Sequence, residues 1–498
     1  MVIMMNKKQR IWVLAGAVTT LIIAAFFLIK DSMYISNYPY LQLIQRPVVQ
    51  STMDQTLFLF VCCVAGAFLG SLIGKSHLGF WYIFLAPVLG LNLWLLLSKL
   101  IIIIGIPYTV FSVVILASLL LITLGISRRS VLKANGISAV DWLVILFCFF
   151  CISLLASSAN FLVFSEDSHS YMGLGESLAT YGKMNADIAD VFSARSIITP
   201  AFFSPSVFFG FNNINGLVFL YGLSFVVSLA YVIYQDLLTS VKKRQALFVA
   251  AGVLAFLFVA NLFTTISLFY FISNQMANVN LFFAIFFVFQ SKKHNSDALL
   301  FLSVAFMLLF IWVRPESPLI AVVLLFFIIN MSLKQNWTRV YIVTCLLAVL
   351  LWYARFFYTA GLDFNEGMFL TAKRAAMVMA AYVLLAVYMV LIPKLKWPKL
   401  IAVKDMLPFA VMIFVIFAFA FYDFDKLFVN IKMIFANTAL IGVWGITILS
   451  LFAVLSMYYV FVKERDIWDK VLWSYFILLQ KLIQSFYQWR PFILRSMM

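Results

Sequence analysis

The sequence predicts an all-α polytopic membrane protein, and three observations lead to this class. Of the 498 residues, 65% are hydrophobic and only 11% are charged, whereas a typical soluble domain carries about 25% charged residues. The mean hydropathy is +1.06. Apolar runs of about 20 residues, the length that crosses a bilayer core about 30 Å thick, recur along the chain. A water-soluble globular fold is therefore excluded.

We expect about 14 transmembrane helices, one for each apolar run. Three of the runs are short, namely 275–290, 298–313 and 340–354, and Lys99 lies between the third and the fourth run. In chain order the runs cover 11–29, 55–74, 79–98, 103–126, 142–163, 206–234, 246–270, 275–290, 298–313, 317–332, 340–354, 375–393, 406–422 and 438–462.

The distribution of charge predicts how these helices are oriented. With a cytoplasmic N-terminus, most of the 35 basic residues fall in inner segments and most of the 19 acidic residues in outer ones, as the positive-inside rule requires. An even number of spans leaves both termini in the cytoplasm, and a bacterial inner (plasma) membrane is the expected location. The net charge of +16 thus reflects topology, and no nucleic-acid partner is expected.

The chain divides into three predicted parts. Residues 1–136 form an N-terminal module of four spans, whose first run lacks a small-residue cleavage site and is expected to remain as an anchor. Residues 137–462 form the transmembrane core, with its longest outer loop at 164–204. Residues 463–498 alternate charged with aromatic side chains, which predicts an interfacial amphipathic helix on the cytoplasmic side.

The outer loop 164–204 is the part of the core where function is expected. Loops longer than about 15 residues inside a compact protein are usually functional. Asp167 or Ser168 is a good helix N-cap, and Gly182 is a good stop. Between them four apolar or aromatic residues recur at helical spacing, which predicts an amphipathic helix on the outer membrane face: Tyr171, Leu174, Leu178 and Tyr181.

Two carboxylates stand at the mouth of the fifth span, Glu166 and Asp167. A partly desolvated carboxylate at the membrane surface can act as a general base near neutral pH, because burial raises its pKa. The alternative is a helix cap or an acidic flank that sets topology. Five cysteines all lie in apolar runs, which favours packing over a disulfide framework or a zinc site.

Two motifs in sequence order carry a family resemblance. The first is Asp167-x-x-x-Tyr171, followed by the amphipathic helix. The second is an apolar helix over 304–313 that ends in Arg314-Pro315-Glu316 and leads into another apolar helix. Together they resemble the GT-C superfamily of integral-membrane glycosyltransferases, such as protein mannosyltransferases and lipid A aminoarabinose transferases. The likeness covers about 141–330.

The resemblance implies a sugar donor linked to a polyprenyl phosphate and an acceptor attacked on the outer side of the membrane. Asp167 matches the acidic base of the family, with Glu166 beside it. Arg314 is a natural partner for the departing lipid phosphate, because a cation placed where charge develops stabilises the transition state. Arg314 is equally well explained as a helix-end residue whose charged head reaches water.

Further binding residues are expected near this site. His169 and Tyr171 either position the acceptor or shape the loop, and a structural role is favoured for His169. The outer segment 355–374 supplies three more candidates for binding phosphate, with ordinary flanking charge as the alternative: Arg355, Lys373 and Arg374. Ser168 stands where many family members have a second acid, so the sequence supports no metal site, and the cofactors are left unassigned.

Two other functions compete with the glycosyltransferase. A transporter or flippase of lipid-linked glycans also suits about 14 helices, but such proteins are often built from repeated halves with charges at mid-membrane. The sequence shows no repeat, and Lys99 alone is a candidate for such a charge. A glycan polymerase or ligase would have a large basic outer loop late in the chain, for which 355–374 is a small candidate.

Overall fold

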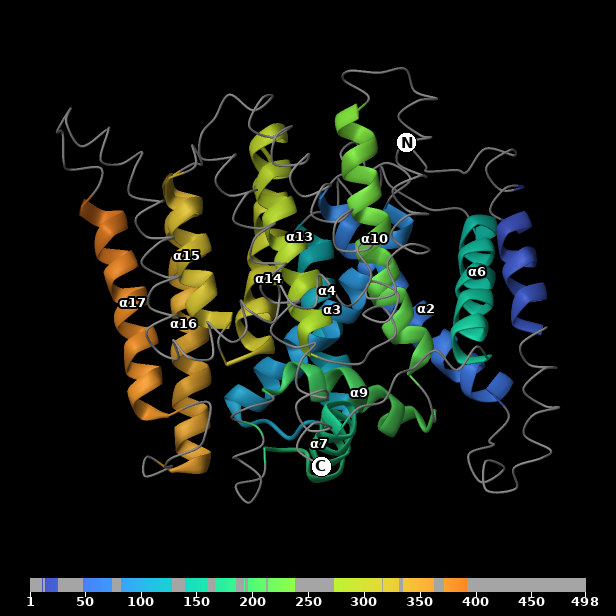
Figure 1. Ribbon diagram of the computed structural model, residues 1–498, viewed down its shortest axis with the longest axis horizontal. Helices are drawn as coiled ribbons and strands as arrows, with labels where there is room; N and C mark the ends of the chain where they lie inside the picture. The colour runs from blue at the N-terminus through green and yellow to red at the C-terminus, as the bar shows by residue number, and fades with distance from the viewer. Residues whose placement is uncertain are drawn as a thin grey trace, which may run out of the picture. The chain divides into compact units, whose positions relative to one another are not determined.

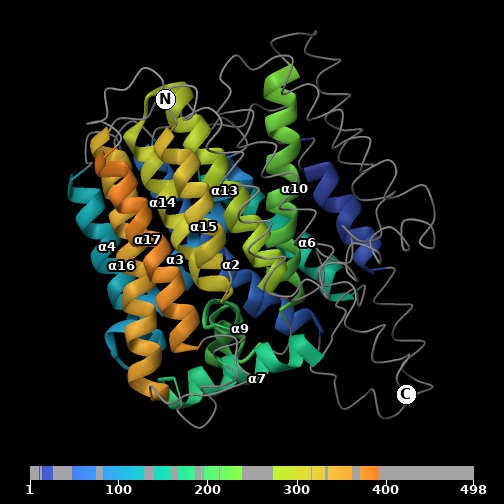
Figure 2. The ribbon, with the colours of Figure 1, turned by 60° about the vertical axis from the view of Figure 1, so that its left-hand side comes forward.

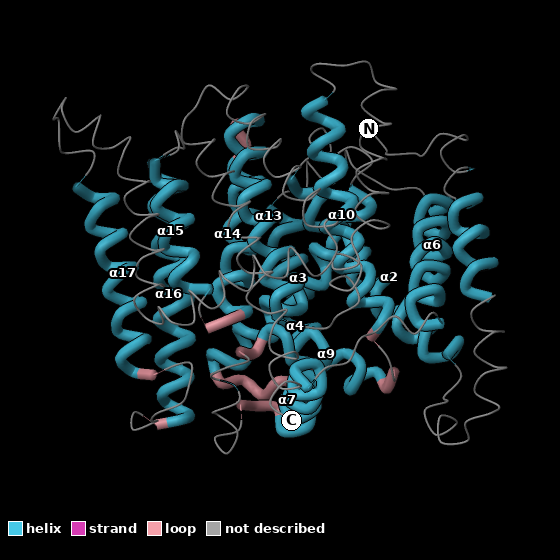
Figure 3. Tube along the Cα trace, in the orientation of Figure 1, coloured by secondary structure: helices cyan, strands magenta, loops and turns pink. Residues whose placement is uncertain are grey.

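The part of the chain that the structure describes consists of helices and a few short loops (Figure 3). The structure is a computed structural model and describes residues 11, 14–25, 48–73, 82–127, 139–158, 166–184, 192, 196–211, 214–237, 273–315, 317–330, 335–361 and 371–391. After a short apolar helix at Leu14–Ala25, the helices are α2 (Val48–Ile73), α3 (Tyr82–Ile104), α4 (Val110–Ser127), α6 (Ala139–Ser158), α7 (Glu166–Tyr181), α9 (Ile198–Phe209), α10 (Asn215–Leu237), α13 (Ser273–His294), α14 (Asp297–Val313), α15 (Ser317–Asn330), α16 (Gln335–Ala360) and α17 (Ala372–Leu391).

Four of these helices are long and apolar enough to cross a membrane: α2, α3, α16 and α17. Others are apolar but shorter, and several expose large hydrophobic side chains, as α4 does with Phe111 and Ile126. Contiguous apolar surface of this kind suits a lipid environment. The predicted all-α membrane class is therefore confirmed, while the count of about 14 spans stays a prediction. Runs 246–270, 406–422 and 438–462 and the tail 463–498 lie outside the described residues.

Predicted helix boundaries are wrong at three places, the first of them within residues 1–136. The expected break beside Lys99 is absent, because α3 continues to Ile104 and keeps Lys99 buried. The helix ends instead at Gly105, which has a φ of +86°, a conformation that glycine adopts without strain.

The expected single span 206–234 is likewise two helices. Helix α9 ends at Gly210, whose φ of +70° is left-handed, and α10 begins only at Asn215. The expected short run 340–354 is extended rather than broken. Phe356 continues its buried face, so α16 reaches Ala360 and includes Arg355.

The described helices form two compact units. The first contains the described residues up to 283, with 312–315 and 351–361; the second contains those of 284–311, 317–350 and 371–391. Helices α13, α14 and α16 thus contribute residues to both units. The predicted division at residue 136 stays a prediction.

The first unit is built around a close crossing of α2 and α3. Gly66 faces the backbone of Ala86, and Gly90 faces the backbone of Cys62, so closely that neither glycine has room for a Cβ atom. Small residues let transmembrane helices approach and gain van der Waals contact, which matters where lipid removes the hydrophobic drive. Helix α6 packs on α2, and α9 and α10 pack on α3 (Figure 1). In its most apolar stretch 83% of the residues of α3 are buried, so α3 is the central helix.

A closed hydrogen-bond network joins three helices inside the first unit. Asn92 of α3 donates from Nδ2 to Oδ1 of Asn280 of α13 at 3.1 Å, and the Tyr221 hydroxyl of α10 donates to Oδ1 of Asn92 at 3.0 Å. Asn280 in turn donates to the Tyr221 oxygen at 2.9 Å and to the Met276 carbonyl at 2.8 Å. All three side chains are buried. Each polar group thus finds a partner inside the apolar interior.

The second unit has its own apolar and polar contacts. Phe287 of α13 stacks on Phe306 of α14 with ring centroids 5.6 Å apart. Ser303 of α14 donates to the Ala284 carbonyl at 2.6 Å and lies 2.8 Å from the hydroxyl of Tyr341 on α16. Helix α17 packs on α15. These contacts hold α13, α14 and α16 together within this unit.

Candidate functional site

The amphipathic helix predicted in the outer loop is present as α7. Tyr171, Leu174 and Leu178 are buried at 2%, 4% and 0% exposure, as their spacing predicts, but Tyr181, the fourth residue of the predicted face, is 62% exposed because it ends the helix beyond the contact with α9. The stop at Gly182 is also confirmed: its φ is +65° and its N–H donates to the Leu178 carbonyl at 3.0 Å. The helix begins at Glu166, so Asp167 lies in the first turn and is not the N-cap.

Helix α7 rests on α9, and together they form what we call the α7–α9 layer, Glu166–Tyr181 with Ile198–Phe209. The two helices approach closely at Gly175, where a Cβ atom would lie 2.6 Å from the Pro200 carbonyl oxygen and 3.0 Å from Phe203. Figure 2 shows α7 running across the direction of α10. A layer that crosses the transmembrane direction suits a position at the membrane surface, as the sequence predicts for this loop.

The end of α7 is tied to the end of α3 through Tyr108. The Tyr108 N–H donates to the Gly182 carbonyl at 2.7 Å. Its buried hydroxyl is hydrogen-bonded to Ser204 of α9 and lies 3.2 Å from the hydroxyl of Ser98 on α3. Burial raises the pKa of Tyr108 to about 12, although hydrogen bonds to Ser204, Ser98 and Trp94 oppose the shift. The hydroxyl is therefore neutral and acts as a fixed link between three helices.

Arg314 lies at the same layer. The Ser196 hydroxyl donates to the carbonyl of Trp312, the penultimate residue of α14. Ser196 has a φ of 60° and stands two residues before α9 begins. Because Arg314 is only two residues beyond Trp312, its backbone lies within about 7 Å of that contact. Its side chain is 8% exposed, so it is a largely buried cation beside the α7–α9 layer.

A second buried cation lies in the same unit. The Lys99 ammonium is 2.9 Å from the ring centroid of Trp352 on α16, and the side chain is 0% exposed. One turn further along α16, the Arg355 guanidinium lies close to Gly105, where a Cβ atom would be 3.5 Å from it. Its carbon also lies 5.6 Å from the ring centroid of Tyr358. Lys99 and Arg355 therefore both lie where the end of α3 packs against α16.

The first unit thus contains the backbone of α7, which carries Glu166 and Asp167. It also contains three of the predicted binding residues, Tyr171, Arg314 and Arg355. The side chains of Glu166, Asp167 and His169 lie outside the described ones. Lys373 and Arg374 belong to the second unit, in the first turn of α17, where the Arg374 N–H donates to Thr371 Oγ1 at 3.2 Å. Among the residues that the structure describes, no three His, Cys, Asp or Glu side chains gather as a metal site.

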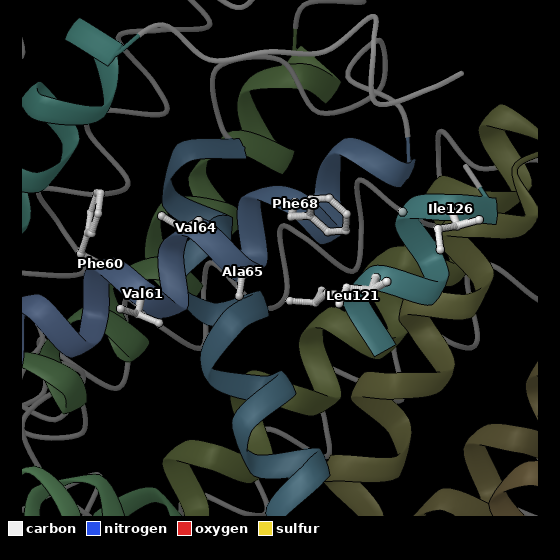
Figure 4. A pocket seen from close by; sticks show the side chains of 9 residues that line it. Phe60, Val61, Val64, Ala65, Phe68, Leu121 and Ile126 are labelled. Atoms are coloured by element: carbon white, nitrogen blue, oxygen red, sulfur yellow. The ribbon is translucent and has the colours of Figure 1, made fainter. Parts of the chain in front are cut away.

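The first unit also has an apolar groove between α2 and α4, with a volume of about 750 Å³ (Figure 4). Several of its walls are exposed, including Val61, Val64 and Ile122. The nine residues that line it are Phe60, Val61, Val64, Ala65, Phe68, Leu121, Ile122, Gly125 and Ile126. With no charged or hydrogen-bonding side chain among them, the groove suits an acyl or isoprenoid chain and offers nothing to fix a polar headgroup.

Sequence reasoning missed two sets of polar residues in this unit. One is the network of Asn92, Tyr221 and Asn280, and the other is the pair of Lys99 with Trp352. Polar residues inside transmembrane runs are rare and face the protein interior, so Asn92 and Asn280 carried a signal in the sequence. Trp352 carried none, since aromatic residues are frequent throughout the chain.

Comparisons with protein-family models, with curated proteins and with solved structures give no match to this chain.

Proposed function

We propose that the protein is a GT-C-type glycosyltransferase that moves a sugar from a polyprenyl-phosphate donor to an acceptor at the outer face of the membrane. The observation that carries the proposal is the hydrogen bond from Ser196 to the Trp312 carbonyl. It ties the start of α9, on which α7 rests, to the turn that carries Arg314. The two motifs, distant in sequence, thus belong to one compact unit.

The chemistry assigned to these residues is a single displacement. The acceptor hydroxyl attacks the anomeric carbon while Asp167 takes its proton. The bond from that carbon to the phosphate oxygen breaks, and the lipid phosphate leaves with the electron pair. Arg314, a buried cation, stabilises the charge that develops on the phosphate. One nucleophilic attack inverts the configuration of the sugar carbon.

The test is sugar transfer in purified membranes, following label from a polyprenyl-phosphate sugar into acceptor fractions. Wild type is compared with Asp167→Asn and with Glu176→Gln at matched expression. Glu176 is an exposed acid on the same helix, so its variant controls for a change of charge on α7. We expect a loss of about 10²-fold or more for Asp167→Asn and none for Glu176→Gln. Equal transfer by wild type and Asp167→Asn contradicts the assignment of the base.

One observation favours a second candidate, a flippase of lipid-linked glycans. Lys99 is a buried charge inside a helix that is long enough to cross the membrane, and such charges mark transport pathways. A flippase moves the lipid across reconstituted vesicles without cleaving it. This candidate is supported over the enzyme if the wild type translocates the lipid-linked glycan without transferring its sugar and Lys99→Met no longer translocates it.

A further inference from the structure

Lys99 is a basic residue in the buried interior of the first unit. It is 0% exposed, it lies within an apolar stretch of α3, and its Nζ has no hydrogen-bond partner among the described residues. Its Nζ lies over the face of Trp352, 2.9 Å from the ring centroid. A ring face attracts a cation but accepts none of the three N–H bonds that an ammonium can donate.

Arg355 has the same deficit. Its Nε is buried and, in the described part of the chain, makes no hydrogen bond. The guanidinium lies beside Gly105, where a Cβ atom would be 3.5 Å from it. Buried donors of charged groups are normally satisfied, because an unsatisfied one carries its full desolvation penalty.

The two cations share one interface. Trp352 and Arg355 are three residues apart on α16, which is about 4.5 Å along the helix, and Lys99 and Gly105 are about 9 Å apart along α3. Since Lys99 contacts Trp352 and Gly105 lies against Arg355, the helices run side by side in the same direction. Both side chains thus lie along one short stretch of α3 and α16, and α3 is followed by the loop in which the Tyr108 N–H donates to the Gly182 carbonyl at the end of α7.

We propose that Lys99 and Arg355 form a binding site for a phosphate group. A tetrahedral phosphate offers several acceptor oxygens and a negative charge, which matches an ammonium with three free donors and a guanidinium with a free Nε. When phosphate binds, the ammonium leaves the face of Trp352 for the oxygens. That this phosphate is the headgroup of a polyprenyl carrier rests on the proposed function; the phosphate site itself does not.

The site is tested by binding, separately from sugar transfer. The full-length protein in detergent is titrated with farnesyl phosphate, farnesol and inorganic phosphate, for wild type, Lys99→Met and Arg355→Gln. Lys183→Met, at an exposed lysine just after α7, is the matched control. We expect both site variants to weaken farnesyl phosphate about tenfold or more, with no change for farnesol or for Lys183→Met. Inorganic phosphate that competes with farnesyl phosphate at equal concentration identifies a free anion as the ligand, and its failure to compete identifies the lipid headgroup.

A stability measurement separates this site from a structural role of Lys99. Methionine fills the same space without charge, so Lys99→Met without ligand is expected to unfold at the temperature of wild type or above it. The proposal is overturned if Lys99→Met unfolds at a lower temperature than wild type and Arg355→Gln binds farnesyl phosphate as wild type does. Lys99 would then be bonded to an acceptor within the chain. Wild-type binding by Lys99→Met overturns it as well. If sugar transfer fails in every arm while phosphate binding follows this pattern, the proposed function is wrong and the site stands.

Discussion

The close contact between α7 and α9 predicts that alanine substitutions at two glycines of α7 change stability differently. Gly173 and Gly175 both lie in the middle of α7. A Cβ atom at Gly173 meets nothing within 4 Å, whereas one at Gly175 lies 2.6 Å from the Pro200 carbonyl oxygen and 3.0 Å from two atoms of Phe203. Alanine at the two positions therefore adds the same methyl group to open space and to a close helix contact.

The expected difference follows from this geometry. Alanine in place of glycine inside a helix gains about 0.5–1 kcal/mol, because glycine has more backbone freedom to lose. This gain is common to both variants and cancels in their comparison. At Gly175 a backbone oxygen lies in the way and cannot rotate aside, so α7 and α9 must separate. Overpacking of this kind costs about 1–3 kcal/mol, and Gly175→Ala is expected to be less stable than Gly173→Ala by that amount.

The assay is equilibrium unfolding of the purified protein in detergent, read by circular dichroism for both variants beside wild type. Gly173→Ala is expected at or above wild-type stability, and Gly175→Ala below it. Sugar transfer measured on the same samples tells whether a displaced α7 also lowers activity. Equal stability of the two alanine variants refutes the close packing of α7 on α9 and, with it, the geometry of the layer.

Two further predictions concern the buried polar links. Because burial raises the pKa of Tyr108 from 10.0 to about 12, its contribution to stability is complete below pH 10 and is lost as the pH rises through 12; at pH 11 the loss is about 1 kcal/mol. Tyr108→Phe is expected to be less stable than wild type by about 1 kcal/mol at pH 8, but its stability should not fall between pH 8 and pH 11. Unfolding temperatures of both proteins over this pH range measure the difference. Parallel curves for the two proteins contradict the prediction. Asn280→Leu removes its bonds to Asn92 and Tyr221 and is expected to lower unfolding free energy by about 0.6–1.7 kcal/mol per bond, measured by denaturant titration; wild-type stability shows that the network contributes nothing.

The sequence predicted α7 well because the signals for it are local. The spacing of Tyr171, Leu174 and Leu178 defines one buried face, and Gly182 supplies the left-handed residue that ends the helix. The apolar runs located the ends of α14 and α15 to within two residues. Composition alone predicted the membrane class, since lipid as solvent requires apolar runs of a set length.

The sequence predicted helix ends poorly where two apolar segments meet. Hydropathy averages over a window, so it did not show that Gly210 separates α9 from α10 or that Lys99 continues α3. Tertiary contacts accompany both outcomes: α9 packs on α7, and Lys99 is buried with its Nζ over the ring of Trp352. The hydrogen bond from Ser196 to the Trp312 carbonyl joins residues 116 positions apart, and no local sequence pattern predicts it.

Two sets of polar groups inside the first unit differ in a way that bears on function. Asn92, Tyr221 and Asn280 bond one another in a closed cycle, which is what stability in an apolar interior requires. Lys99 and Arg355 are basic side chains, and in the described part of the chain Lys99 Nζ and Arg355 Nε make no hydrogen bond. Stability alone favours apolar residues at such positions. Their presence at the stretch of α3 and α16 that leads to the α7–α9 layer is therefore explained by an anion that binds there during function.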